Sequence, residues 1–174
     1  TTPLASREQF ALSPERAALL AERLRTQAAL AEVVVLNTCN RLEIYGACAE
    51  GTIQPREIFE VVTGTTHEGC EALDWAEIES HLYAHQGEDC IHHLFRVASS
   101  LDSLVVGETE IVGQVKRAYL QAQAAGTTGK ILNRLFQKAL SVSKRVRTRS
   151  GIGRCSTSVG SVSLDLAEKI FGED

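Results

Sequence analysis

Residues 33–46 read VVVLNTCNRLEIYG, and this stretch decides how the chain folds. Four consecutive aliphatic residues at 33–36 predict a buried strand, and the pattern of residues 41–45 predicts a second extended segment. The small polar residues 37–40 between them predict a tight turn. Cys39 would then lie at the end of a strand, where a nucleophile can be held rigidly and still reach a substrate. The alternative is a small buried cysteine that only packs.

The composition is that of a globular protein with reduced cysteines. The 174 residues are 44% hydrophobic and 23% charged, which fits neither a disordered nor a membrane-spanning chain. No apolar run approaches the roughly 18 residues that cross a bilayer and no basic leader precedes the fold, so we expect a cytoplasmic protein without a membrane partner. The 5 cysteines form no CxxC pair, which argues against a disulfide framework and a structural zinc site.

Charge is distributed unevenly along the chain. The net charge is -4, yet residues 111–164 contain no Asp or Glu. A positive surface on an acidic protein predicts a polyanionic partner that meets one face, although a solvated helix face would show the same pattern. The basic residues of this part are Lys116, Arg117, Lys130, Arg134, Lys138, Lys144, Arg145, Arg147, Arg149 and Arg154.

Helices are predicted on both sides of the hairpin. A Ser-Pro-Glu start predicts a helix over 13–31, and a second helix is expected over 55–64. Residues 81–85 alternate as in a short strand. From residue 88 onward apolar residues recur at helical spacing, in helices that begin near residues 88, 111, 128 and 156. This order predicts an α+β fold of the ferredoxin-like, split βαβ type without its opening strand, followed by a helical subdomain.

A group of histidines invites a metal-site hypothesis. His81 and His85 precede Cys90, His92 and His93 in the sequence. On one strand, however, His81 and His85 would lie about 13 Å apart, too far to bind one ion, so we expect no metal. His93 could act as an acid or base of near-neutral pKa, or it could be a half-exposed helix histidine.

A polar cluster interrupts the apolar residues of 103–114. Glu110 and Gln114 share one helix face, with Ser103 and Glu108 just upstream. This arrangement predicts hydrogen bonds to a polar ligand or, alternatively, an internal capping network.

Three long motifs resemble glutamyl-tRNA reductase, the enzyme that opens the five-carbon route to tetrapyrroles. They are TCNRLEIY at 38–45, HLFRVASSLDSLVVGETEIVGQVKRAY at 93–119 and FQKALSVSKRVRTRSGIG at 136–153. With TPLASREQFA near the start and VGSVSLDLA near the end, the likeness covers nearly the whole chain. It implies that a cysteine takes glutamate from tRNA as a thioester, which NADPH then reduces to glutamate-1-semialdehyde.

The resemblance also implies roles for individual residues. Cys39 would be the nucleophile, and His93 an activity-sensitive histidine that orients the substrate or protonates the departing ribose oxygen. Arg41 suits a substrate carboxylate, because a guanidinium can bind one bidentately. The other implied substrate residues are Thr38, Asn40, Ser103, Glu108, Thr109, Glu110 and Gln114.

Two positions depart from the family pattern. Glu110 stands where glutamine is usual, so an acceptor replaces an amide that could also donate and would favour the substrate's ammonium group. Ser100 stands where glycine is frequent, a difference expected to have little effect.

The expected domain organisation follows from the same likeness. Residues 1–90 would form the α/β part of a catalytic domain, 91–155 its helical part, and 156–174 the start of a connecting helix. The resemblance implies an NADPH-binding domain and a helical dimerisation domain after the catalytic one. Neither is in this sequence, which has no GxGxxG fingerprint, so we expect a fragment.

The full-length enzyme is then expected to be a cytoplasmic homodimer that acts on glutamyl-tRNA, with glutamate-1-semialdehyde aminomutase as a further partner. This chain alone would form the thioester and lose it to water, so it would show at most esterase activity. The alternative function is a non-catalytic tRNA-binding or regulatory module, in which basic helices bind phosphates and Cys39 only packs.

Overall fold

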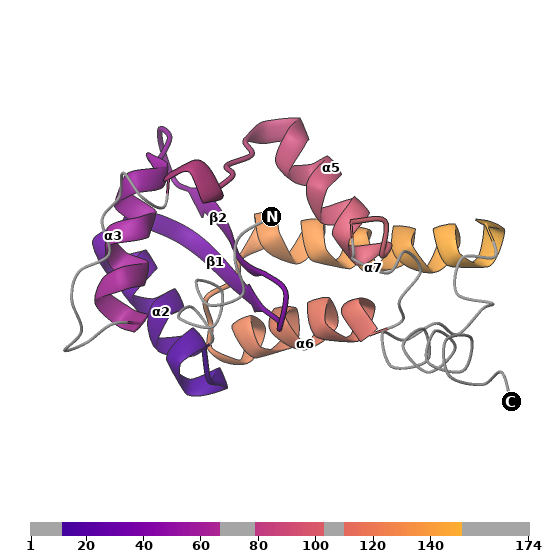
Figure 1. Ribbon diagram of the computed structural model, residues 1–174, viewed down its shortest axis with the longest axis horizontal. Helices are drawn as coiled ribbons and strands as arrows, with labels where there is room; N and C mark the ends of the chain where they lie inside the picture. The colour runs from indigo at the N-terminus through magenta and orange to yellow at the C-terminus, as the bar shows by residue number, and fades with distance from the viewer. Residues whose placement is uncertain (1–11, 67–78, 103–109, 151–174) are drawn as a thin grey trace, which may run out of the picture. The chain divides into compact units, whose positions relative to one another are not determined.

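The computed structural model describes residues 12–66, 79–102 and 110–150. Within these ranges the chain is a mixed α+β protein, as the sequence predicts, with an antiparallel β-hairpin and α-helices (Figure 1). No helix of the described part is both long and apolar enough to cross a membrane.

The chain divides into two compact units, which are described separately. The first comprises residues 1–85 and 117–134, and the second comprises residues 86–116 and 135–174. The helices α6 (Glu110–Ala124) and α7 (Lys130–Ser150) each contribute residues to both units.

The hairpin is the centre of the first unit. Strand β1 (Leu30–Asn37) pairs with β2 (Leu42–Cys48), and the register places Val34 opposite Tyr45. Both strands are longer than the apolar pattern predicts, because backbone pairing continues past the hydrophobic residues. Gly46 permits this continuation, since a Cβ there would lie 2.6 Å from Cδ2 of Leu30.

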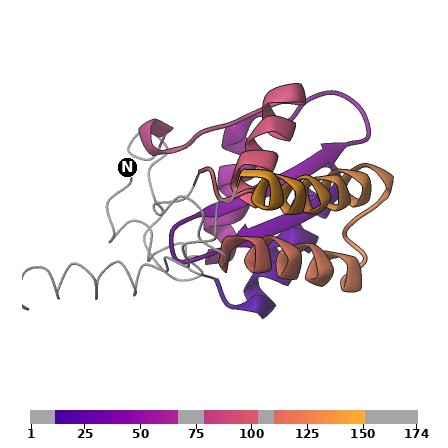
Figure 2. The same cartoon turned by 90° about the vertical axis from the view of Figure 1, so that its right-hand side faces the viewer.

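Strand β1 is buried on both faces. Side chains alternate along a strand, so Val33 and Val35 face one side and Val34 and Leu36 the other. All four are at most 8% exposed. Val33 and Val35 belong to one core with residues of the helices α2 (Pro14–Gln27) and α3 (Pro55–Thr66). Figures 1 and 2 show the ribbons of the hairpin and these helices from two directions. Burial of each such side chain contributes roughly 1.5–3 kcal/mol.

Helix α2 begins as the sequence predicts but ends earlier. Oγ of Ser13 accepts a hydrogen bond from the backbone N–H of Arg16 at 3.3 Å, and Pro14 occupies the first turn. The helix ends at Gln27 rather than near residue 31, because Ala29 adopts a left-handed conformation with φ 49°. The residues after it form β1 instead.

Glu32 on β1 caps the start of α7. Its carboxylate is buried and accepts the backbone N–H groups of Ile131 at 3.0 Å and Leu132 at 2.7 Å. The first amides of a helix have no intrahelical partner and carry partial positive charge, so a carboxylate there is stabilising. A Cβ on Gly129 would lie 2.6 Å from Oε1 of Glu32, so this close approach requires glycine.

Thr127 occupies part of the second edge of β1. The N–H of Val33 donates to the Thr127 carbonyl at 2.7 Å, and Oγ1 of Thr127 donates to the Val33 carbonyl at 2.9 Å. Nη1 of Arg25 on α2 donates to the carbonyl of the neighbouring Gly126 at 3.1 Å. The turn before α7 is therefore bonded to both the sheet and a helix of the first unit.

The helix α5 (Gly87–Ala98) of the second unit ends in a Schellman motif. The N–H of Leu101 donates to the Arg96 carbonyl at 2.9 Å, and the N–H of Ser100 donates to the Val97 carbonyl at 3.0 Å. Ser100 is completely buried with φ 61°, a conformation that glycine adopts without strain. This explains why glycine suits this position in the family that the chain resembles.

The strand predicted over residues 81–85 is wrong. A short 3₁₀ helix, η1 (Glu79–His81), is followed by residues without regular structure up to α5. Alternation alone does not make a strand, because a strand also needs a partner for its backbone. The helices predicted from residues 55, 88, 111 and 128 are confirmed as α3, α5, α6 and α7, and the one predicted near 156 lies outside the described residues.

Replacing Ala29 with glycine is expected to stabilise the chain. The left-handed conformation costs an L-residue such as Ala29 about 1–2 kcal/mol, and glycine avoids this cost. Glycine in turn loses about 0.5–1 kcal/mol through its greater conformational freedom in the unfolded chain, which offsets part of the gain. Ala29→Gly should therefore raise the free energy of unfolding in urea by about 0.5–1 kcal/mol. Ala18→Gly, an exposed change within α2, is the control and should lower it by about 1 kcal/mol. Destabilisation by Ala29→Gly would contradict the assigned conformation.

Glu32 should make stability depend on pH. Burial raises the pKa of Glu32, but hydrogen bonds from the first amides of α7 lower it, and the result lies below the ordinary value. The folded protein therefore binds this proton less readily than the unfolded chain. The contribution is fully present above the ordinary pKa of about 4.3 and is lost as the pH falls through the folded pKa.

Glu32→Gln tests this contribution by urea unfolding at several pH values. We expect a loss of roughly 1–3 kcal/mol at pH 7 and a smaller loss near pH 3, because an uncharged amide cannot match the carboxylate at these amides. Glu60→Gln, at an exposed carboxylate on α3, is the matched control and should change little. Equal losses at both pH values would contradict the assigned role of the charge.

Candidate functional site

The turn that carries Cys39 is held by the side chain of Thr38. The backbone N–H of Thr38 donates to the Arg41 carbonyl at 2.9 Å. Oγ1 of Thr38 accepts the N–H groups of Asn40 at 3.2 Å and Arg41 at 3.1 Å. Four residues, 38–41, connect the two strands, and neither Cys39 nor Asn40 has a positive φ. Hairpin loops of this length are most often built around a type I turn, which the hydrogen bonds of the threonine hydroxyl stabilise further.

Cys39 is exposed at this turn. The alternative from the sequence, a buried cysteine that only packs, is wrong. Cys48 on β2 is only partly exposed and packs against the core of the first unit, so the two cysteines of the hairpin differ in accessibility. An accessible thiol on a hydrogen-bonded turn can attack an electrophile without rearrangement of the strands that carry it.

Arg41, the last residue of the turn, is paired with a carboxylate on β2. Nη1 of Arg41 lies 2.8 Å from Oε1 of Glu43, and the two side chains are 15% and 5% exposed. Glu43 also accepts a hydrogen bond from the hydroxyl of Tyr45 at 2.5 Å. The pairing orients the guanidinium, so a substrate carboxylate would meet an arginine already fixed in position.

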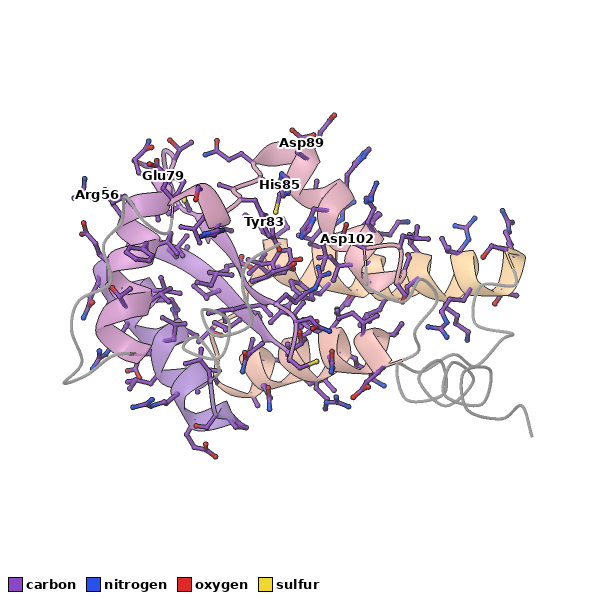
Figure 3. All side chains as sticks on the ribbon, viewed as in Figure 1. Arg56, Glu79, Tyr83, His85, Asp89 and Asp102 are labelled. Atoms are coloured by element: carbon purple, nitrogen blue, oxygen red, sulfur yellow. The ribbon has the colours of Figure 1, made fainter. Side chains whose placement is uncertain are left out.

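Tyr83 reaches the same carboxylate from a distant part of the chain. Its hydroxyl donates to Oε1 of Glu43 at 2.5 Å. Its ring lies beside His85, with ring centroids 5.5 Å apart, in the segment before α5 (Figure 3). The Glu43 carboxylate thus collects one guanidinium and two phenol donors, which satisfies a charge that burial would otherwise make costly.

The sequence analysis missed this carboxylate cluster of Glu43, Tyr45 and Tyr83. One signal was available for part of it: Arg41, Glu43 and Tyr45 alternate along a strand and therefore share a face. Tyr83 gave no such signal, because its contact depends on the path of residues that form no regular element.

The other predicted site residues belong to the second unit or lie outside the described residues. His93 is half-buried near the middle of α5. Glu110 is the exposed first residue of α6, and Gln114 follows one turn later and is half-buried. Ser103, Glu108 and Thr109 lie outside the described residues. Of the predicted site residues, the described part of the first unit contains the four of the turn, 38–41.

Neither the described histidines nor the main surface depression offers another site. No group of three His, Cys, Asp or Glu residues in the described part of the chain could hold a metal ion. An open depression of about 510 Å³ lies between the end of α2 and α3. It contains none of the predicted residues and is lined by Glu50, Glu57 and Glu60, which disfavours an anionic ligand.

The site is thus an exposed cysteine on a hydrogen-bonded hairpin turn, followed two residues later by a paired arginine, in an α+β domain. Comparison with known proteins gives the particular family. The family model "Glutamyl-tRNAGlu reductase, N-terminal domain" matches residues 1–150, so the chain belongs to this family.

Individual relatives agree with this assignment. The chain is 45% identical over 173 residues to the glutamyl-tRNA reductase of Akkermansia muciniphila, a match that covers 99% of this chain and 49% of the relative. For the enzyme of Syntrophus aciditrophicus the identity is 44%, covering 99% of this chain and 40% of the relative. The chain thus spans less than half the length of these curated relatives.

A solved structure supports the fold. The glutamyl-tRNA reductase from Methanopyrus kandleri matches 97% of this chain with a TM-score of 0.68 and 31% sequence identity. The match covers 37% of that chain. The α+β fold class predicted from the sequence is confirmed.

The Arg41–Glu43 pair should show strong energetic coupling. We expect a double-mutant cycle of Arg41→Gln and Glu43→Gln, followed by urea unfolding, to give a coupling energy of about 1–3 kcal/mol, because the pair is largely buried. The exposed pair of Arg56 and Glu60 is the matched control, with an expected coupling of about 0.3–0.5 kcal/mol.

A milder variant keeps this prediction testable if Glu43→Gln does not fold. Tyr83→Phe removes one donor to the carboxylate and should cost roughly 1–2 kcal/mol. Coupling no larger than in the exposed pair, together with a neutral Tyr83→Phe, would show that the cluster does not hold Arg41.

Proposed function

We propose that this chain is the catalytic domain of a glutamyl-tRNA reductase and that Cys39 is its nucleophile. The observation that carries the proposal is the exposed thiol of Cys39 on the Thr38-bonded turn, in a chain of this family. The reaction supported is transfer of the glutamyl group from the tRNA ester to the cysteine.

The transfer needs one bond formed and one broken. The Cys39 sulfur attacks the ester carbonyl carbon and forms the carbon–sulfur bond of a thioester. The bond from that carbon to the ribose oxygen breaks, and the proton lost by the thiol ends on this oxygen, which releases free tRNA. Water can then add to the thioester, releasing glutamate and restoring the thiol.

Substrate recognition is proposed for the residues around the turn and on the helices. Arg41 would bind the glutamate side-chain carboxylate through its guanidinium, oriented by Glu43. Thr38 and Asn40 would contact the reacting glutamyl group. Glu110 would favour the substrate's ammonium group, and His93 would protonate the departing ribose oxygen or orient the substrate. Ser103, Glu108, Thr109 and Gln114 complete the proposed substrate set.

Reduction of the thioester by NADPH would give glutamate-1-semialdehyde for tetrapyrrole biosynthesis. The described residues do not fit a dinucleotide site, because their sheet is an antiparallel hairpin and the sequence has no GxGxxG fingerprint. Action in the cytoplasm, a homodimer and an aminomutase partner are further proposals for the full-length enzyme.

The thioester proposal predicts weak, Cys39-dependent esterase activity. Incubation of this chain with labelled glutamyl-tRNA should release glutamate faster than the uncatalysed reaction, and Cys39→Ser should abolish the excess. Cys48→Ser is the matched control and should keep it, because Cys48 packs against the core. Cys39→Ser should bind tRNA as tightly as the parent chain.

Two results would decide against catalysis. If the release of glutamate does not depend on Cys39, the cysteine is not the nucleophile. If Cys39→Ser weakens tRNA binding as strongly as it slows the release of glutamate, the cysteine has a structural role. That result would favour the alternative function, a non-catalytic tRNA-binding module. The rates at which the individual cysteines are alkylated give a second test. A catalytic Cys39 should be alkylated much faster than the other cysteines.

A further inference from the structure

The second half of α7 presents a row of basic side chains. Within the second unit α7 supplies residues 135–150, which contain no Asp or Glu. Four of its cations are exposed, and three of these, Lys138, Arg145 and Arg149, lie on one side of the helix. We call these three residues the α7 stripe.

The stripe occupies one side of the helix. At 100° per residue its members fall within a sector of about 40°, and at 1.5 Å per residue they extend over roughly 16 Å. The buried residues Phe136, Ala139 and Ser143, at most 1% exposed, lie on a different side of α7. The stripe therefore points away from the packed face of this helix.

The stripe is not neutralised within the described part of the chain. No described carboxylate forms an ion pair with any of its three members, whereas Arg96 in the same unit pairs with Asp102 at 3.6 Å. Arg145 and Arg149 are also one helical turn apart, a spacing at which like charges destabilise a helix by about 0.2–0.5 kcal/mol. A polyanion bound across the stripe would remove this repulsion.

We propose that the α7 stripe binds the phosphate backbone of tRNA. The choice of tRNA as the polyanion rests on the proposed function, whereas the exposure and positive charge of the stripe do not depend on it. Arginine binds phosphate bidentately, and the exposed hydroxyl residues Ser141 and Thr148 adjoin the stripe and suit phosphate oxygens. Residues 135–150 expose no large apolar side chain, so a protein partner would lack the apolar anchors that such interfaces need.

Binding of uncharged tRNA at several salt concentrations tests this surface. Each lost phosphate contact lowers the slope of log affinity against log salt by about 1, so Arg145→Gln should lower it by about 1 and the triple variant K138Q/R145Q/R149Q by about 2–3. The triple variant should also bind roughly tenfold or more weakly at moderate salt.

Lys144→Gln is the matched control for the loss of one charge. Lys144 is the exposed neighbour of Arg145 but lies at least about 100° around the helix from the stripe, so its loss should leave the slope unchanged. Circular dichroism should show the same helix content in every variant. Uncharged tRNA has no ester, so the result is independent of whether Cys39 is catalytic.

Three outcomes would overturn the proposal. The first is a triple variant with the parent's affinity and salt slope. The second is an equal effect of Lys144→Gln and Arg145→Gln, which would indicate diffuse charge rather than a defined surface. The third is competition by polyglutamate as effective as that by tRNA, which would point to an acidic protein partner.

Discussion

The first unit depends most on the hydrogen bonds between the Glu32 carboxylate and the first backbone amides of α7. The carboxylate is buried on β1, where an unpaired charge would be costly, and the amides at the start of α7 satisfy it. The same contact supplies negative charge at the positive end of a helix whose sequence is otherwise basic. Thr127 bonds to both backbone groups of the neighbouring Val33, so the turn before α7 is attached to the sheet at two adjacent points. A helix start and a strand that are far apart in sequence thereby define each other's position.

This attachment gives the hairpin a rigid base for the turn at its other end. β1 is buried on both faces and β2 is held by its register, so the mobility of Cys39 depends on the turn alone. Thr38 restricts that turn through four hydrogen bonds to Asn40 and Arg41. Glu43 then fixes the orientation of the Arg41 guanidinium. The turn of the proposed nucleophile and the guanidinium of its proposed carboxylate-binding partner are preorganised, which would lower the entropic cost of positioning a glutamyl group.

The sequence predicted helices and strands well where a short stretch of residues was sufficient to define them. Ser13 and Pro14 marked the start of α2, and helical periodicity marked α5, α6 and α7. It failed for residues 81–85, where alternation suggested a strand but no partner was available. It also placed the end of α2 too late, because nothing in the sequence shows that Ala29 adopts a positive φ. In the site, the residues of the turn were predicted, but the carboxylate that holds Arg41 was not.

The sequence by itself determined the class of fold, the hairpin with its tight turn, the uneven distribution of charge and, through its motifs, the family. These properties depend on residues that are close together in the chain, so periodicity and turn chemistry reveal them. Only the tertiary structure decided that Cys39 is accessible, that Arg41 is paired, and that Glu43 and Tyr83 meet. It also decided that Glu32 caps a helix far along the chain. Such contacts join residues distant in sequence, and they arise only when packing brings buried polar groups within reach of the partners that offset their desolvation.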